Sequence, residues 1–194
     1  MAKTLESSLE LDLVNEAQNG NSSAFGQLYD AHIKKIYDFI YYKTMHKDIA
    51  EDITSDVFMK AWRNINQFSG DSFTAWLYKI ARNSVIDYYR SRKNLINIED
   101  CWDLESGNDL LASLDQTIKA EEIKKAMQDL KSRDREIIIM RIWQDLSFKE
   151  IAECLGQNEG AVKMAFGRAI SRLKTKVPLS IFILWPYLLS LSNK

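Results

Sequence analysis

The side chains between residues 73 and 93 combine the three chemical types that a single nucleic-acid strand requires. Cations neutralise phosphates, amides exchange hydrogen bonds with bases, and aromatic rings stack on them. Apolar residues recur here at i, i+3 and i+4 spacing, which predicts a helix. Its other positions carry Lys79, Arg82, Asn83, Tyr88, Tyr89, Arg90, Arg92 and Lys93, with Asp87 as the single acid. The pattern favours a nucleic-acid-binding face; the alternative is a basic helix surface that faces only solvent.

A second group of basic residues lies within residues 148–174, in a pattern typical of a helix-turn-helix. Phe148 would begin the first helix, Ala152 is small where the two helices touch, and Gly156 supplies the turn. Asn158 is placed to cap the second helix. The expected core positions are Ile151, Leu155, Val162 and Ala165, and the exposed cations are Lys163, Arg168, Arg172 and Lys174. We expect this second helix to enter a DNA major groove; the alternative is an ordinary helical hairpin.

No comparable set of residues predicts catalysis or a metal site. Cys101 and Cys154 do not form a C-x-x-C motif, and His32 and His46 lie far from both in sequence. A zinc cluster and a disulfide framework are therefore not expected. There is also no Ser/His/Asp set and no phosphate-binding glycine loop. We therefore expect a non-enzymatic protein without a cofactor or a bound metal. We also expect it to be cytoplasmic, because the polar, acidic N-terminus is unlike a signal peptide.

A helical scaffold must position these residues. The chain has 194 residues, 46% of them hydrophobic, but only seven glycines and two prolines, which favours an all-α fold. Periodicity predicts one helix from about Phe25, capped by Asn21, Ser22 or Ser23, and a second helix capped by Asp48. The second helix has an apolar stripe of Ile49, Ile53, Val57, Ala61, Trp62 and Ile65. With the helix from Phe73, these two predict a three- or four-helix bundle.

The net charge of −1 conceals three charge regions. Residues 1–93 carry twelve bases and twelve acids, whereas residues 94–116 carry six acids and no base. Residues 117–194 carry fourteen bases and nine acids, and we expect their first helices at about 117–130 and 134–143. The acidic strip, which also contains Gly107 and Asn108, predicts a linker between two helical blocks.

Four segments, in this order, resemble the sigma-70 family of bacterial RNA polymerase specificity factors in its short form, the extracytoplasmic-function (ECF) group. They are AFGQLYDAHIKKIYDFIY, DIAEDITSDVFMKAW, FTAWLYKIARNSVIDYYRSRK and LKSRDREIIIMRIWQDLSFKEIAECLGQNEGAVKMAFGRAISRLK. The resemblance covers about residues 24–174. It implies a region 2-like bundle at 21–93, a linker at 94–116 and a region 4-like helix-turn-helix domain at 117–176. An N-terminal extension at 1–20 and an apolar tail at 177–194 remain outside the resemblance.

The resemblance also implies three binding surfaces. Core RNA polymerase would bind the second helix through Asp48, Glu51, Asp52, Asp56 and Phe58. The minus-10 promoter element would be melted, and a flipped base held, by Ser69, Gly70, Asp71, Ser72, Asn83, Tyr88, Arg90 and Arg92. The minus-35 element would be read as a duplex by Glu159, Gly160, Lys163, Met164, Gly167 and Arg168. Spacing alone places the four acids of the first set outside the apolar stripe, whereas it favours the core for Phe58 and for Trp62.

The recognition helix departs from the family pattern at two places. The family usually has Lys-Ser-Arg where this chain has Lys163, Met164 and Ala165. Gly167 lies within the helix, where it costs about 1 kcal/mol relative to alanine. We therefore expect either a close approach of the backbone to a partner or a weakened helix, and the promoter sequence does not carry over from the family.

The C-terminal segment also departs from the family pattern. Residues 177–192 contain no charge, but as a helix they would span roughly 24 Å against the roughly 30 Å of a hydrocarbon core, and Pro178 and Pro186 interrupt them. The favoured interpretation is packing on the second domain. The alternatives are a docking surface for an anti-sigma factor or polymerase, and a membrane contact through Trp185 and Tyr187.

The combined hypothesis is a transcription initiation (sigma) factor that binds core RNA polymerase and promoter DNA, with an anti-sigma factor as regulator. The alternative is a stand-alone helix-turn-helix repressor or activator that binds duplex operator DNA. A membrane-associated interaction protein would be supported by the tail alone.

Overall fold

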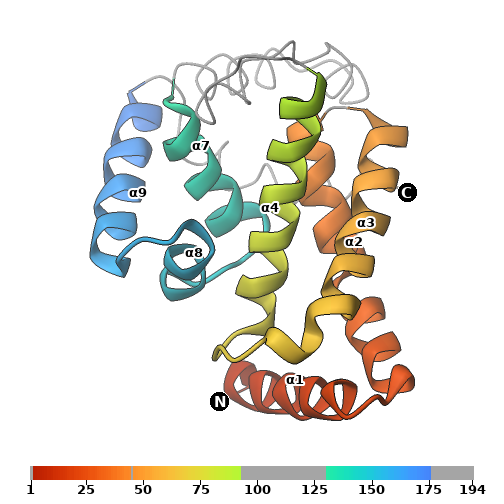
Figure 1. Cartoon of the computed structure of the whole chain (residues 1–194). Coiled ribbons are helices and arrows are strands. Elements are labelled where there is room, and N and C mark those ends of the chain that lie inside the picture. The colour runs from red at the N-terminus through yellow and green to blue at the C-terminus, as the bar shows by residue number, and fades with distance from the viewer. Residues whose placement is uncertain (1, 45, 93–129, 176–194) are drawn as a thin grey trace, which may run out of the picture. The chain divides into compact units, whose positions relative to one another are not determined.

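The structure, a computed structural model, describes residues 2–44, 46–92 and 130–175 (Figure 1). All the regular elements in these ranges are helices, which confirms the expected all-α fold for this part of the chain. The expected linker at 94–116, nearly all of the expected helix at 117–130 and the tail at 177–194 lie outside the described residues. The chain divides into two compact units, which are described separately: the first contains residues 1–95, and the second contains most of the chain that follows.

The first unit is a bundle built around α2 (Ser22–Thr44), which packs against three other helices. These are α1 (Ala2–Gln18), α3 (Lys47–Asn64) and α4 (Phe73–Arg92), and the short 3-10 helix η1 (Ile65–Gln67) follows α3 directly. The largest buried side chains are Leu28, Ile36, Phe39, Ile40, Phe73, Leu77 and Tyr78. Apolar residues at helical spacing therefore form the core, as periodicity predicts.

The first helix of this unit occupies the segment that lies outside the resemblance and is expected only as an N-terminal extension. Val14 and Ala17 of α1 are buried, and α1 contacts α2, η1 and α4. Figure 1 shows α1 crossing the end of the bundle at which α3 ends and α4 begins. Residues 2–18 are therefore an integral part of the first unit.

The starts of α2 and α3 differ in their capping. Asn21 is the cap of α2, because its Oδ1 accepts hydrogen bonds from the backbone N–H groups of Ser23 at 3.0 Å and Ala24 at 3.2 Å. The expectation that Asp48 caps α3 is wrong, since α3 begins at Lys47 and its N-cap is His46, which makes no side-chain capping bond. Asp48 lies within the first turn, where its negative charge interacts favourably with the helix dipole.

The second unit contains three described helices. They are α7 (Ser132–Ile138), continued by the π-helical turn η3 (Ile139–Trp143), then α8 (Phe148–Leu155) and α9 (Glu159–Lys174). A cluster of Leu130, Ile138, Ala169 and Leu173 holds α9 against α7, and Ile142, Trp143, Phe166 and Ile170 pack around it. No helix in the described ranges is long and apolar enough to cross a membrane.

Candidate protein and nucleic-acid interfaces

The acidic residues of α3 form an exposed surface, as their spacing predicts. Asp48, Glu51 and Asp52 are exposed on the first two turns of the helix. Asp56, one turn further, is half-buried, and its Oδ2 lies 2.7 Å from Lys60 Nζ. Three carboxylates therefore face solvent together, although Glu51 Oε1 also lies 3.8 Å from Lys47 Nζ of the same helix.

The electrostatic effect of this acidic surface extends to a neighbouring tyrosine of α2. Burial raises the pKa of the Tyr37 hydroxyl, and the negative charge of Glu51 raises it further, followed by smaller contributions that include Asp38 and Asp48. Tyr37 therefore stays protonated and neutral beside the acidic surface at neutral pH.

Of two aromatic residues of α3 that spacing places in the core, Phe58 is buried and Trp62 is exposed. Phe58, expected at the binding surface from the family resemblance, is only 4% exposed and packs edge-on against Tyr29 at 4.7 Å between ring centroids. Trp62, expected in the buried stripe, is 38% exposed and contacts Phe25 at 4.9 Å. Phe58 is therefore a core residue, as spacing predicts. The prediction that Trp62 is buried is wrong, because its ring packs at the edge of the core.

Exposed apolar groups continue the acidic surface along α3, and they were missed in the sequence. Met59 is 50% exposed and lies seven residues, or two turns, after the exposed Asp52. Residues seven positions apart share one side of a helix, so this spacing is the signal that was available. The exposed side of α3 is therefore acidic at its start and apolar, through Met59 and Trp62, near its end.

The loop 69–72 connects η1 to α4 and contains four of the expected minus-10 residues. Ser69, Gly70 and Asp71 are exposed, whereas Ser72 is half-buried. The Ser72 Oγ accepts a hydrogen bond from the backbone N–H of Ala75 at 3.1 Å, so it caps α4. The loop thus presents polar groups at its tip and ends in a fixed helix start.

The basic side of α4 contains fewer residues than the sequence predicts. Lys79, Asn83 and Arg90 are exposed, and their spacings of four and seven residues place them on one side of the helix. Tyr88 lies on the other side, since it precedes Arg90 by two positions, and its half-buried ring contacts that of Tyr89 at 5.4 Å. The structure therefore brings Asn83 and Arg90 together and separates Tyr88 from them, while the Arg92 side chain is outside the described residues.

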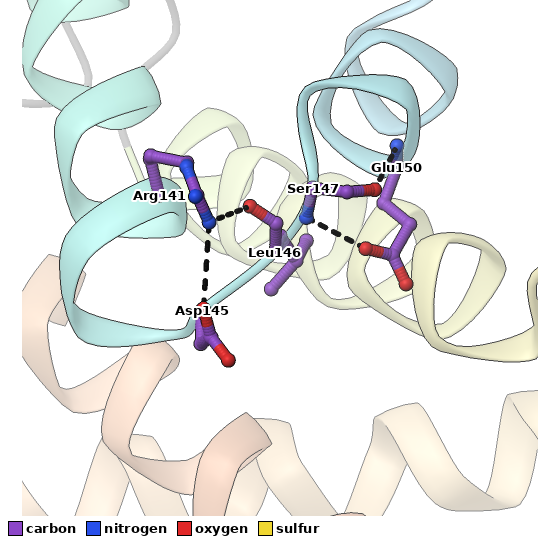
Figure 2. Close-up of polar contacts among 5 residues, drawn as sticks. All are labelled: Arg141, Asp145, Leu146, Ser147 and Glu150. Carbon is purple, nitrogen blue, oxygen red and sulfur yellow. Dashed lines mark hydrogen bonds and ion pairs between the residues drawn. The ribbon is translucent and has the colours of Figure 1, made fainter. Parts of the chain in front are cut away.

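A capping box fixes the start of the first helix of the helix-turn-helix. The backbone N–H of Ser147 donates to Glu150 Oε2 at 2.7 Å, and the backbone N–H of Glu150 is 3.2 Å from Ser147 Oγ (Figure 2).

Arg141 Nη1 donates to the Leu146 carbonyl at 3.1 Å and pairs with Asp145 at 3.4 Å. Asp145 has a φ of 52°, an uncommon value for a residue other than glycine, so these contacts hold a tight turn before α8.

An aromatic residue links the three helices of the second unit. The Arg141 guanidinium lies 5.3 Å from the centroid of the Phe148 ring, and that ring contacts Phe166 of α9 edge-on at 5.3 Å. Since Arg141 belongs to η3, Phe148 to α8 and Phe166 to α9, the orientation of α9 is set by packing on both preceding elements.

The turn into α9 confirms the sequence interpretation. Gly156 has a φ of 64°, which a residue with a Cβ adopts poorly. The Asn158 Oδ1 accepts a hydrogen bond from the Ala161 backbone N–H at 2.7 Å. The small or apolar positions Ile151, Ala152, Val162 and Ala165 are buried, and Leu155 is half-buried. This chain segment is therefore a helix-turn-helix with α9 as its second helix.

All six expected minus-35 residues lie on the exposed side of α9. They are Glu159, Gly160, Lys163, Met164, Gly167 and Arg168. Met164 is 62% exposed, and Lys163 Nζ lies 2.7 Å from Glu159 Oε1. A Cβ added to Gly167 would meet nothing within 4 Å. The outer side of α9 thus combines cations, one exposed methionine and two exposed glycines that carry no side chain.

The described residues contain no group suited to hold a metal. Within 2–44, 46–92 and 130–175, no three His, Cys, Asp or Glu side chains come together for an ion. Cys154 is buried in α8 as a free thiol, and Cys101 is outside the described residues.

Comparisons with known proteins match both units. A family model described as Sigma-70 region 2 matches residues 28–95, and one described as Sigma-70, region 4 matches residues 120–173. The ECF RNA polymerase sigma factor BldN of Streptomyces coelicolor is 34% identical over 179 residues, which cover 89% of this chain and 67% of that protein. The sigma factor RpoE of Bartonella quintana, solved with the anti-sigma factor NepR, has a TM-score of 0.60 at 27% identity and covers 78% of this chain and 94% of that one. CnrH, solved with the cytosolic domain of CnrY, has a TM-score of 0.66 at 24% identity and covers 86% of this chain and 96% of that one, which supports the fold.

Proposed function

The chain belongs to the ECF group of the sigma-70 family, and is thus a transcription initiation factor; we propose that it binds core RNA polymerase and promoter DNA through three separate surfaces. Sigma factors are non-enzymatic, and we infer that this chain likewise leaves the chemistry of RNA synthesis to the polymerase. Because core polymerase is a cytoplasmic enzyme, the proposal places the chain in the cytoplasm.

The polymerase-binding surface is the exposed side of α3. Asp48, Glu51 and Asp52 supply the negative charge, and Asp56 adds a carboxylate that must exchange its contact with Lys60 if it is to bind a partner. Met59 and Trp62 add apolar area at the other end of the same side. Charged groups at the rim steer association, whereas a desolvated aromatic residue supplies more of the affinity. Phe58 acts indirectly, because its ring lies in the core.

The minus-10 surface comprises the loop 69–72 and one side of α4. Extruding a base from the duplex costs a few kcal/mol, so a protein must offer replacement hydrogen bonds and stacking. The exposed tip of the loop offers hydroxyl, carboxylate and backbone groups, while Asn83 and Arg90 follow on α4 to contact a strand. Tyr88 contributes by packing α4 in place, and Arg92, the last residue of α4, adds one positive charge to the proposed set.

The minus-35 surface is the outer side of α9. Lys163 and Arg168 are exposed cations suited to phosphates, and Met164 offers an apolar contact to bases. Gly160 and Gly167 present no side chain, so the helix backbone can approach DNA closely at these two points.

An anti-sigma factor is the proposed regulator. The Bartonella quintana sigma factor was solved in complex with one, and CnrH was solved with the cytosolic domain of CnrY. An anti-sigma factor that covers the acidic and apolar surface of α3 prevents polymerase binding by direct competition. The acidic linker at 94–116 and the tail at 177–194 remain further candidate contacts of polymerase and of this regulator.

The observation that carries the proposal is the coexistence, in one chain, of a match to Sigma-70 region 2 and a match to Sigma-70, region 4. The helix-turn-helix of the second unit suits a stand-alone repressor equally well. A repressor has no need of the region 2 bundle at residues 28–95, with its exposed acidic surface on α3. The comparisons therefore favour the sigma factor over the repressor.

Co-elution with core polymerase tests the proposal. The full chain is mixed with core RNA polymerase from the same organism and separated by size-exclusion chromatography, with the chain alone and the chain plus duplex DNA as controls. We expect a stoichiometric complex with polymerase and weak binding to free duplex. A chain that ignores polymerase but shifts duplex DNA at nanomolar concentration would be a repressor instead.

A further inference from the structure

We propose that α1 is a brace for the loop 69–72: Gln18 and Glu10 fix the two ends of this loop and preorganise it for an unpaired promoter strand. The inference rests on the proposed minus-10 role of the loop, and it assigns a function to the N-terminal helix, which lies outside the family resemblance. It concerns contacts within the first unit only.

The upstream end of the loop is held by the last residue of α1. Gln18 Nε2 donates hydrogen bonds to the carbonyl oxygens of Ile65 and Phe68, each at 2.9 Å. Ile65 begins η1, and Phe68 is the residue directly before the loop. Both N–H groups of one side-chain amide are thus used, and they connect the two ends of η1 to α1.

The downstream end is held by the carboxylate of Glu10, eight residues, or just over two turns, before Gln18 in α1. Thr74, the second residue of α4, donates from Oγ1 to Glu10 Oε1 at 3.1 Å. The buried His32 of α2 donates from Nε2 to the same oxygen at 2.7 Å, and its ring lies 5.7 Å from that of Phe73. The side chain of Glu10 is only 18% exposed, so its position is strongly fixed by these two partners.

The two contacts act together because they come from one side of one rigid helix. Glu10 and Gln18 are eight residues apart, and the buried Val14 and Ala17 lie on the same side between them. Burial of Val14 and Ala17 docks α1 on the bundle, and the two polar side chains then reach residues 68 and 74 on either side of the loop.

The loop gains a defined path while the residues at its tip stay exposed. Ser69, Gly70 and Asp71 are exposed, although the residues before and after them are anchored. Ordering a loop upon binding costs conformational entropy, and a loop that is already ordered avoids much of that cost. The brace therefore raises affinity for the unpaired strand without contacting it.

Two variants separate the brace from general stability. Gln18→Leu removes both amide donors with little change in volume, and Thr74→Val removes one hydroxyl with almost no change in shape. Gln27→Leu makes the same amide-to-leucine change at an exposed position of α2 and serves as the matched control. Each protein is assembled with core polymerase from the same organism.

Three quantities are measured for each variant. The first is the affinity of the holoenzyme for a single-stranded oligonucleotide that the wild-type holoenzyme selects from a randomised minus-10 pool. The second is the affinity of the chain for core polymerase, and the third is the thermal midpoint of the free chain. Ser69→Ala, alone and combined with Gln18→Leu, completes a double-mutant cycle.

We expect Gln18→Leu and Thr74→Val each to weaken oligonucleotide binding by about fivefold or more, the scale of one lost hydrogen bond. The affinity of both variants for polymerase should stay within about twofold of wild type, because the polymerase surface on α3 does not depend on the loop. Gln27→Leu should match wild type in all three measurements, because the exposed Gln27 side chain is not part of the brace. The Gln18→Leu and Ser69→Ala effects should be non-additive, since both act through one loop.

The outcomes distinguish the brace from the proposed role of the loop. If Ser69→Ala weakens oligonucleotide binding but Gln18→Leu and Thr74→Val do not, the brace is wrong. If the two variants lower polymerase affinity, thermal midpoint and oligonucleotide affinity together, α1 is merely structural and the inference also fails. If neither the loop variant nor the brace variants affect the oligonucleotide, the minus-10 role of the loop is itself wrong. Should Gln18→Leu not fold, Thr74→Val decides alone.

Discussion

Gly167 of α9 offers a substitution whose effects on stability and on DNA binding should have opposite signs. Glycine inside a helix is about 1 kcal/mol less favourable than alanine, because its backbone loses more freedom. A Cβ at this position meets nothing within 4 Å in the protein, so Gly167→Ala introduces no clash to offset that gain. We therefore expect Gly167→Ala to stabilise the second unit by about 1 kcal/mol, or roughly 4–8 °C in thermal midpoint for a unit of this size.

The same methyl group lies on the side of α9 that we assign to the minus-35 element. If the helix backbone approaches DNA at Gly167, the methyl group forces the helix outward and lengthens neighbouring contacts, including those of Arg168. A loss of about tenfold in minus-35-dependent promoter binding corresponds to about 1.4 kcal/mol, the cost of weakening one or two such contacts. The variant is thus expected to be more stable and less able to bind the promoter.

Thermal unfolding and promoter binding by the reconstituted holoenzyme measure the two effects. Gly26→Ala is the matched control, because Gly26 lies within α2 and a Cβ there also meets nothing within 4 Å. It should stabilise the first unit and leave promoter binding unchanged. A lower midpoint for Gly167→Ala would refute the helix-propensity argument, and unchanged promoter affinity would remove Gly167 from the DNA interface.

Three further predictions concern charge and capping. Reversing Glu51 and Asp52 to lysine should abolish polymerase binding in a pull-down and leave the helical circular dichroism unchanged, because both residues are exposed. The control variant Asp30→Lys on α2 should bind polymerase normally, and a loss of helicity in the double variant would contradict the prediction. Lys163→Ala should lower the slope of log affinity against log salt by about 0.9 if this cation neutralises one phosphate, and an identical slope would show that it does not. Asn158→Ala should destabilise the second unit by about 1 kcal/mol in chemical denaturation and Asn158→Asp should not, and equal stabilities would argue against the cap.

The helix-turn-helix was the most predictable part of the fold. Its residue types are dictated by local geometry: Gly156 by a positive φ, Asn158 by exposed N–H groups, and Ala152 by close packing. The exposed positions of α9 followed from the same frame. Local rules therefore sufficed where each residue has one steric or hydrogen-bonding reason.

The first unit shows where such rules stop. Periodicity placed Trp62 in the core, but a residue at the edge of an apolar stripe can rest on the rim, and its neighbours decide which. His46 rather than Asp48 is the N-cap of α3, because helix boundaries depend on the chain that precedes them as well as on capping preference.

Tertiary contacts account for the rest of the difference. Glu10, Gln18 and Thr74 are ordinary polar residues in sequence, and only the fold brings them to the two ends of one loop. Tyr88 looked like a strand-binding residue because of its basic neighbours, yet it lies on the other side of α4 from Asn83 and Arg90. Residue type indicates which chemistry a side chain can perform, but the fold selects which residues share a surface.

Reconstituted transcription tests the central claim most directly. Core polymerase is incubated with a promoter library randomised at the minus-10 and minus-35 elements, with and without the full chain, and run-off transcripts are sequenced. The account predicts that the chain enriches one bipartite promoter class, and that Glu51 and Asp52 reversed to lysine eliminate this enrichment. A chain that yields no enriched promoter with polymerase, while binding one duplex sequence tightly on its own, would contradict it.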